Sequence, residues 1–245
     1  MRESSLRFAT EPHESAVVVT AHGTLDGTTS SALRGTLHKC LVDQPDAIVL
    51  DLTGTAVADR NSLTVLSAVA RQASLWPAVP FVVVESRPDV LNQLRRLGIP
   101  RVLALRGTVR AALATIAHDG ARPTVRELLP PISGAARHAR TVVTEGCLRW
   151  GLADLVGSAC AVVTELVSNA TRHAGTTMTL RVSHRGRWLL VALEDGGVDL
   201  PERRAMPGPT DGDGGRGLAL VEALTHRWGC LPTDAGKVVW AVLQA

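Results

Sequence analysis

The stretch TELVSNATRHAG, residues 164–175, combines an apolar helical face with a column of polar groups. Its apolar residues, with those just before it, have the spacing of one buried face of a helix. They are Val162, Val163, Leu166, Val167 and Ala170. Glu165, Asn169 and His173 recur every four residues, so they lie above one another on the same helix. Because an unpartnered carboxylate is costly beside apolar surface, the column is either a solvated stripe or the wall of a site.

Length and composition exclude several classes of protein. The chain has 245 residues, of which 45% are apolar, so we expect a substantial core and one or two domains. The net charge is +3 without basic runs that carry interleaved aromatics, which argues against direct nucleic-acid binding. No apolar run approaches ~18 residues, so we expect no membrane span and a cytoplasmic location. Four scattered cysteines, Cys40, Cys147, Cys160 and Cys230, are expected to be reduced thiols.

Helix- and strand-breaking residues gather in residues 118–131, which contain Asp-Gly, Arg-Pro and Pro-Pro. We therefore expect a first domain at 1–120, a linker at 121–130 and a second domain at 131–245. In the first domain, strands and helices alternate, which predicts a mixed sheet with helices packed on it. The expected strands are 16–26, 47–54, 81–86 and 102–105, and the expected helices are 28–41, 61–76, 88–98 and 108–117.

In the second domain, helices precede strands, which predicts an α/β sandwich with helices on one face of the sheet. The expected helices are 134–150, 154–173 and 216–228, and the expected strands are 177–184, 188–195 and 237–244.

Two further motifs in the second domain suggest ligand chemistry. In EDGG, Asp195 ends an expected strand and Gly197 follows, so a carboxylate and an open backbone are available to an amine-bearing base. The alternative is a plain Asp-Gly turn. In DGDGGRGLALVEAL, residues 211–224, glycines match G-x-G-x-x-G, but no strand precedes them, so we reject a dinucleotide-binding fold. What remains is a glycine-rich helix N-terminus, which favours phosphate.

In this order, the three motifs resemble the GHKL (HATPase) superfamily of gyrase, histidine kinases and mismatch-repair ATPases. The segments TELVSNATRHAGT, LEDGG, GGRGLALVEAL, HRWG and GKVVWAVL are similar to the anti-sigma-factor serine kinases common in actinomycetes. The resemblance runs from about Leu129 to the C-terminus. It implies a Bergerat-type α/β sandwich that binds ATP and Mg²⁺.

The resemblance also implies roles for individual residues. Glu165 is the catalytic group that activates the acceptor hydroxyl, and Asn169 is the Mg²⁺ ligand. The implied cofactor-binding residues are Asn169, His173, Asp195, Gly197, Gly215, Arg216, Gly217 and Leu218. Of these, His173 either helps to neutralise phosphate charge or is only a surface histidine at the helix end. Asp195 would read adenine, and the helix start at Gly215 and Gly217 would cradle phosphates.

Three other positions follow from the same resemblance. Residues 198–214 correspond to a lid over ATP, whose Arg203 and Arg204 either reach phosphate oxygens or are solvated loop charges. Relatives usually carry Thr in the final strand, where adenine is contacted, and Val238 takes that place here.

The N-terminal half resembles a different family. The segments HGTLDGTTSSALRGTL and IVLDLTGTAVADRNSLTVL are similar to STAS domains, the anti-anti-sigma fold, over about Leu6 to Ala117. In that family a Ser at the start of a helix accepts phosphate, where free N–H groups stabilise the anion. Asn61 stands at the acceptor position here and Ser62 follows it. The acceptor is therefore either lost or shifted to Ser62, and Asp59 is either part of the motif or only the helix N-cap.

These resemblances imply an ATP-dependent serine/threonine kinase that acts on a STAS anti-anti-sigma protein in sigma-factor partner switching. The alternative is a non-catalytic, ATP-responsive module that sequesters a sigma factor or a STAS partner. A free-standing ATPase is a weaker third reading. The expected partners are a sigma factor, a STAS protein or both, and a homodimer is compatible with this kinase branch.

Overall fold

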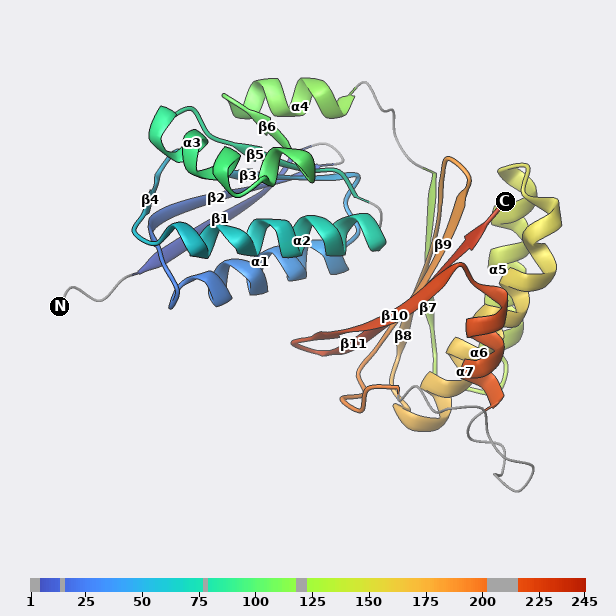
Figure 1. Cartoon of the computed structure of the whole chain (residues 1–245). Coiled ribbons are helices and arrows are strands. Elements are labelled where there is room, and N and C mark those ends of the chain that lie inside the picture. The colour runs from blue at the N-terminus through green and yellow to red at the C-terminus, as the bar shows by residue number, and fades with distance from the viewer. Residues whose placement is uncertain (1–4, 14–15, 77–78, 118–122, 202–215) are drawn as a thin grey trace. The chain divides into compact units, whose positions relative to one another are not determined.

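The computed structural model describes the chain in five stretches and folds it into two compact units (Figure 1). The described residues are 5–13, 16–76, 79–117, 123–201 and 216–245. The units are Met1–Ala121 and Arg122–Ala245, and each has its own sheet and its own hydrophobic core.

The first unit contains a six-stranded mixed sheet in the order β1-β2-β3-β5-β6, with β4 paired to β2. Its strands are β1 (Leu6–His13), β2 (Ala16–Leu25), β3 (Ala47–Asp51), β4 (Thr55–Val57), β5 (Phe81–Val84) and β6 (Ala104–Arg106). Only the β1–β2 pair is antiparallel among these described pairings. The central strands β3 and β5 are almost entirely buried, as expected for parallel strands that are covered on both faces.

Helices cover both faces of this first sheet. On one face, α1 (Ser30–Val42), α2 (Thr64–Leu75) and α3 (Pro88–Arg96) enclose the larger core. On the other face, Ala112 of α4 (Val109–Ala117) packs against valines of β2, β3 and β5. Two short 3₁₀ helices complete the unit, η1 (Arg60–Leu63) and η2 (Ile99–Arg101).

The second unit is a two-layer α/β sandwich, as its sequence predicts. Its antiparallel sheet has the order β10-β11-β9-β8-β7. The strands are β7 (Thr124–Leu129), β8 (Met178–Arg185), β9 (Trp188–Asp195), β10 (Arg227–Thr233) and β11 (Gly236–Gln244). Its helices are α5 (Ala135–Arg149), α6 (Val156–His173) and α7 (Arg216–Leu224), with η3 (Ala153–Leu155) before α6. All three α-helices lie on one face of the sheet (Figure 1).

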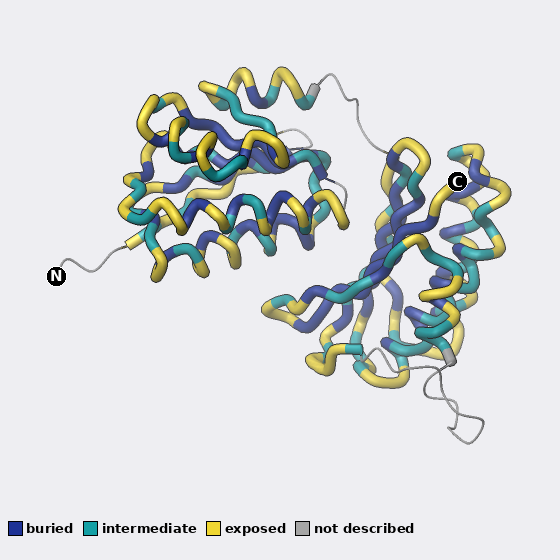
Figure 2. The backbone as a smooth tube through the Cα atoms, in the orientation of Figure 1, coloured by how far each residue is buried: buried dark blue, intermediate teal, exposed yellow. Residues whose placement is uncertain are grey.

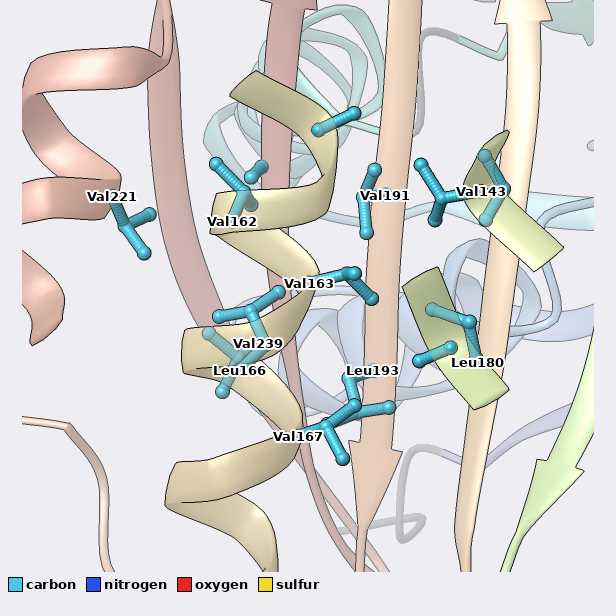
Figure 3. Close-up of a cluster of buried hydrophobic side chains, with 14 of the residues drawn as sticks. Val143, Val162, Val163, Leu166, Val167, Leu180, Val191, Leu193, Val221 and Val239 are labelled. Carbon is cyan, nitrogen blue, oxygen red and sulfur yellow. The ribbon is translucent and has the colours of Figure 1, made fainter. Parts of the chain in front are cut away.

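The core of the second unit forms between α6 and the sheet. Val163, Leu166 and Val167 of α6 lie beside Leu193 of β9 and Val239 of β11 (Figure 3). Figure 2 shows the resulting pattern, in which the inner sides of sheet and helices are buried and the outer sides of the helices are exposed. The apolar spacing seen in the sequence is therefore the face by which α6 is attached.

The structure corrects the expected elements at three places. The helix expected at 216–228 ends at Leu224, and Arg227–Thr233 forms β10, which pairs with β11. The expected linker at 121–130 contains β7, an edge strand whose exposed and more buried residues alternate. In the first unit, β1 and β4 were not expected, because β1 is mostly exposed and β4 has three residues.

The structure bears on two expectations, the absence of a membrane span and the reduced state of the cysteines. In the described stretches, no helix combines the length and apolarity needed to cross a bilayer. All four cysteines are free. Burial raises the pKa of the Cys40, Cys147 and Cys230 thiols to about 11, so these thiols are neutral near pH 7.

We predict that Leu166→Ala lowers the free energy of unfolding of the second unit by about 2–5 kcal/mol, because it leaves a cavity under α6. Urea unfolding followed by tryptophan fluorescence measures this, since Trp150, Trp188, Trp228 and Trp240 lie in this unit. The control Leu148→Ala, on the exposed side of α5, should change stability by less than about 0.5 kcal/mol. Equal effects of the two variants would contradict the packing described here.

Candidate functional site

The polar column of α6 lies on a side of the helix that is more exposed than its apolar face. Glu165 and Asn169 are half-buried and His173 is exposed, whereas Leu166 and Val167 are buried. The helix ends directly after this column, and Gly175 follows with φ +61°, a conformation that glycine adopts without strain. The column therefore has the placement of a site wall, with half-buried groups that a ligand can reach.

The first turn of α7 lies against Glu165, the first residue of this column. A methyl group on Gly217 would overlap Oε2 of Glu165, so the two elements approach this closely only because residue 217 is glycine. Leu218 is half-buried and packs against the hydrophobic core, so its side chain anchors the helix start. A carboxylate and a helix N-terminus, which favours anions, thus lie side by side.

The segment after β9 lies beside the C-terminal end of α6. A side chain at Gly197 would contact the Cβ atom of Ala174 at 3.0 Å. The backbone N–H of Gly196 donates to Oγ1 of Thr176 at 2.8 Å. The Asp-x-Gly motif is thereby fixed beside the last turn of α6.

Asp195 is buried and paired with a residue that sequence reasoning did not identify. Its side chain is 2% exposed, and Oδ1 accepts from the N–H of Gly197 at 2.8 Å and from Nζ of Lys237 at 2.8 Å. Lys237 is also buried, and its ammonium donates to the carbonyl of Gly197 at 3.1 Å. A Cβ at Gly197 would lie 2.7 Å from that ammonium, so the missing side chain makes room for Lys237.

Strand parity explains why Lys237, and not Val238, faces Asp195. Lys237 pairs with Asp195 in the β9–β11 register. It shares its face of β11 with Val239 and Ala241, which belong to the core under the helices. The side chain of Val238 therefore lies on the opposite face, away from the position that the resemblance assigned to it. The sequence contained one signal that could have drawn attention to Lys237, because Lys39 and Lys237 are the only lysines among 26 basic residues.

The two ends of the site are separated by a distance that suits a nucleoside triphosphate. Glu165 and Ala174 are nine residues apart on or next to α6, which corresponds to about 14 Å along the helix. At one end, the carboxylate of Asp195 is an acceptor that suits the amine-bearing edge of a base. At the other end, the amide oxygen of Asn169 suits Mg²⁺, and the glycine start of α7 suits phosphate. The side chains fit ATP in chemistry and in order.

Several expected site residues cannot be placed. Gly215, Arg203, Arg204 and most of the expected lid, residues 202–214, lie outside the described residues, as does the side chain of Arg216.

In the first unit, the expected acceptor region forms η1 and the start of α2. Asp59 is the N-cap of η1, and its carboxylate accepts from the N–H of Asn61 at 2.9 Å, so the capping interpretation is confirmed. Ser62 is buried, and its hydroxyl donates to the carbonyl of Asp59, whereas Asn61 is exposed. A cavity of about 390 Å³ lies here, lined in part by Arg34, Asn61 and Ser62. This geometry disfavours phosphorylation of Ser62, because the residue is buried and its hydroxyl is bonded to the carbonyl of Asp59.

We predict that Asp195→Ala destabilises the second unit by about 3–5 kcal/mol, because it leaves the Lys237 ammonium buried without a counter-ion. Urea unfolding measures the loss. Asp199→Ala, an exposed change four residues later, should leave the unfolding midpoint unchanged. If the two substitutions change the unfolding midpoint equally, breaking the buried ion pair does not destabilise the second unit.

Comparisons with known proteins divide the chain in the same way. The profile of the STAS domain family matches residues 7–112. The profile of the histidine kinase-like ATPase domain family matches residues 130–243. No curated protein matches the chain.

Several solved structures resemble the first part of the chain. An anti-sigma factor antagonist from Mycobacterium paratuberculosis is 25% identical with a TM-score of 0.43, over 46% of this chain and 95% of its own. A variant of RsbS from Moorella thermoacetica is 23% identical with a TM-score of 0.41, over 46% and 96%. The phosphorylated Bacillus cell fate determinant SpoIIAA is 14% identical with a TM-score of 0.37, over 45% and 99%. By its two family profiles, the chain consists of a STAS domain followed by a histidine kinase-like ATPase domain, and ATP binding is implied by the second.

Proposed function

We propose that the chain is an anti-sigma-type regulator whose second unit is an ATP-dependent serine/threonine kinase for a STAS anti-anti-sigma protein. The observation that carries this proposal is the half-buried Glu165 beside the glycine start of α7. A site that only senses nucleotide needs phosphate- and base-binding groups, but it has no need of a carboxylate at this point. The union of STAS and ATPase domains in one chain supports the partner-switching context.

In the proposed reaction, the residues of the second unit bind, orient and move one proton. Asp195 would accept from the exocyclic amine of the base, and Asn169 would ligate Mg²⁺. Glu165 would take the proton from the hydroxyl of a Ser on the STAS substrate. ATP supplies the γ-phosphoryl group, so the protein contributes mainly positioning and charge stabilisation. Because ATP and sigma factors are cytoplasmic, the proposal places the chain in the cytoplasm.

A second function is favoured by the first unit. Asn61 has no hydroxyl, and the hydroxyl of Ser62 is buried and bonded to Asp59. The STAS unit of this chain therefore lacks a usable acceptor at the family position. This favours a non-catalytic module, in which ATP adjusts the affinity for a sigma factor or a separate STAS protein without phosphoryl transfer.

We predict that Asn169→Ala abolishes Mg²⁺-dependent ATP binding, because the amide oxygen is the only metal ligand that the proposal draws from α6. Isothermal calorimetry with ATP, with and without Mg²⁺, measures the effect. Gly157→Ala is the matched control, because it lies on the same helix and a methyl group there meets open space. Undiminished binding by the Asn169 variant would remove this residue from the site.

We predict that restoring the acceptor reveals the kinase. With MgATP, the intact mass of the wild-type chain should stay unchanged, whereas Asn61→Ser should gain one phosphate on residue 61. The gain should disappear in Asn61→Ser/Glu165→Gln, because the proton acceptor is lost. Mass spectrometry of the intact chain and of its peptides measures this.

The outcome of that experiment also separates the two functions. If Asn61→Ser binds MgATP but takes up no phosphate, and ADP does not accumulate, the non-catalytic module is the better account. Phosphate on the wild-type chain at Ser62 would show that the buried hydroxyl becomes accessible, and would overturn the geometric argument above.

A further inference from the structure

We propose that Lys237 is a positioning residue that keeps Asp195 a pure hydrogen-bond acceptor, and that it thereby makes the site select adenine over a keto purine. The inference rests on the proposed nucleotide site and assigns a role to a residue for which neither the motifs nor the family profiles supply one. It concerns base recognition alone and is independent of whether phosphoryl transfer occurs.

The first step is the geometry of the carboxylate. Oδ1 of Asp195 accepts two hydrogen bonds at 2.8 Å, from the N–H of Gly197 and from Nζ of Lys237. A carboxylate has two oxygens and about four acceptor sites. With Oδ1 held from two directions, the carboxylate has a fixed plane, and Oδ2 retains its acceptor capacity for a ligand.

The second step is the ion pair between Asp195 and Lys237. Its side chain is 2% exposed and that of Lys237 is 8% exposed, so both charges are removed from most of the solvent. Burial disfavours a charged carboxylate, and an adjacent ammonium favours it. Cys230 also faces this pair from β10, but burial raises the pKa of its thiol to about 11, so it adds no charge near neutral pH. Lys237 is therefore the cation that pairs with the Asp195 carboxylate and fixes its orientation.

The third step connects the oriented carboxylate to base specificity. An ionised carboxylate accepts hydrogen bonds but donates none, so it suits the exocyclic amine of adenine and opposes the keto oxygen of hypoxanthine. Without the ammonium, the carboxylate loses the partner that fixes its plane, so its second oxygen is no longer held toward the amine of adenine and the preference over the keto base is lost. Lys237 also donates to the carbonyl of Gly197 at 3.1 Å, so it fixes the backbone beside the base as well.

The test compares ATP with inosine triphosphate, which has a keto group in place of the amine, by isothermal calorimetry on the full-length chain with Mg²⁺. We expect the wild-type chain to prefer ATP on the order of tenfold to a hundredfold, the value of a hydrogen bond to a charged group. In Lys237→Met, which keeps the length of the side chain, the ratio should fall to about one or invert. Lys39→Met replaces the other lysine, exposed on α1, and should retain the wild-type ratio.

A second variant keeps the proposal testable if Lys237→Met does not fold. Lys237→Met leaves Asp195 without its cation, whereas Asp195→Asn/Lys237→Met replaces the ion pair by neutral groups of similar size, which buried sites tolerate. This double variant should fold by circular dichroism and bind both nucleotides alike, because an amide both donates and accepts.

The possible results are distinguishable. If either folded variant keeps the wild-type preference for ATP, Lys237 is only a structural counter-ion and the proposal is overturned. If the wild-type chain binds neither nucleotide, the nucleotide site itself fails, and with it the proposed function. If the wild-type chain binds both equally, the site exists but Asp195 does not select the base, which also overturns the role assigned to Lys237.

Discussion

The packing of α6 against the sheet of the second unit is the constraint on which the candidate site depends. Successive residues of a helix are rotated by about 100°, so the buried positions of Leu166 and Val167 also fix the direction of Glu165 and Asn169. Turning the column away from α7 would expose the apolar face to water. The hydrophobic core therefore orients the polar groups, although it contains none of them.

A second constraint is the buried ion pair at the end of β9, which contributes little to stability but affects the proposed function. A buried ion pair is often no more stable than an apolar pair of the same shape, because desolvation offsets the attraction between the charges. The pairing of Asp195 with Lys237 is thus poorly explained as a stabilising device. It is better explained as the means of orienting a buried carboxylate, which the proposed base-reading role requires.

The sequence predicts those features that depend on local spacing, and it fails where distant segments determine the result. The helical period of residues 156–173 and the buried runs of β3 and β5 are local, so the two-unit α/β fold was predictable. Strand β10 was not predicted, because Gly229 and Pro232 are poor strand formers and the segment is ordered by pairing with β11. Lys237 was missed for a similar reason, since its partner is 42 residues away.

In the first unit, the backbone of the acceptor region is formed, but the acceptor hydroxyl expected there is missing. The Asp59 cap, η1 and the start of α2 build a helix N-terminus of the kind that stabilises a phosphate group, yet Asn61 has no hydroxyl and that of Ser62 is bonded to the carbonyl of Asp59. An exposed amide at this position can take part in binding without being consumed by phosphoryl transfer. If the proposed kinase function holds, this arrangement favours a separate STAS protein as the acceptor of phosphate.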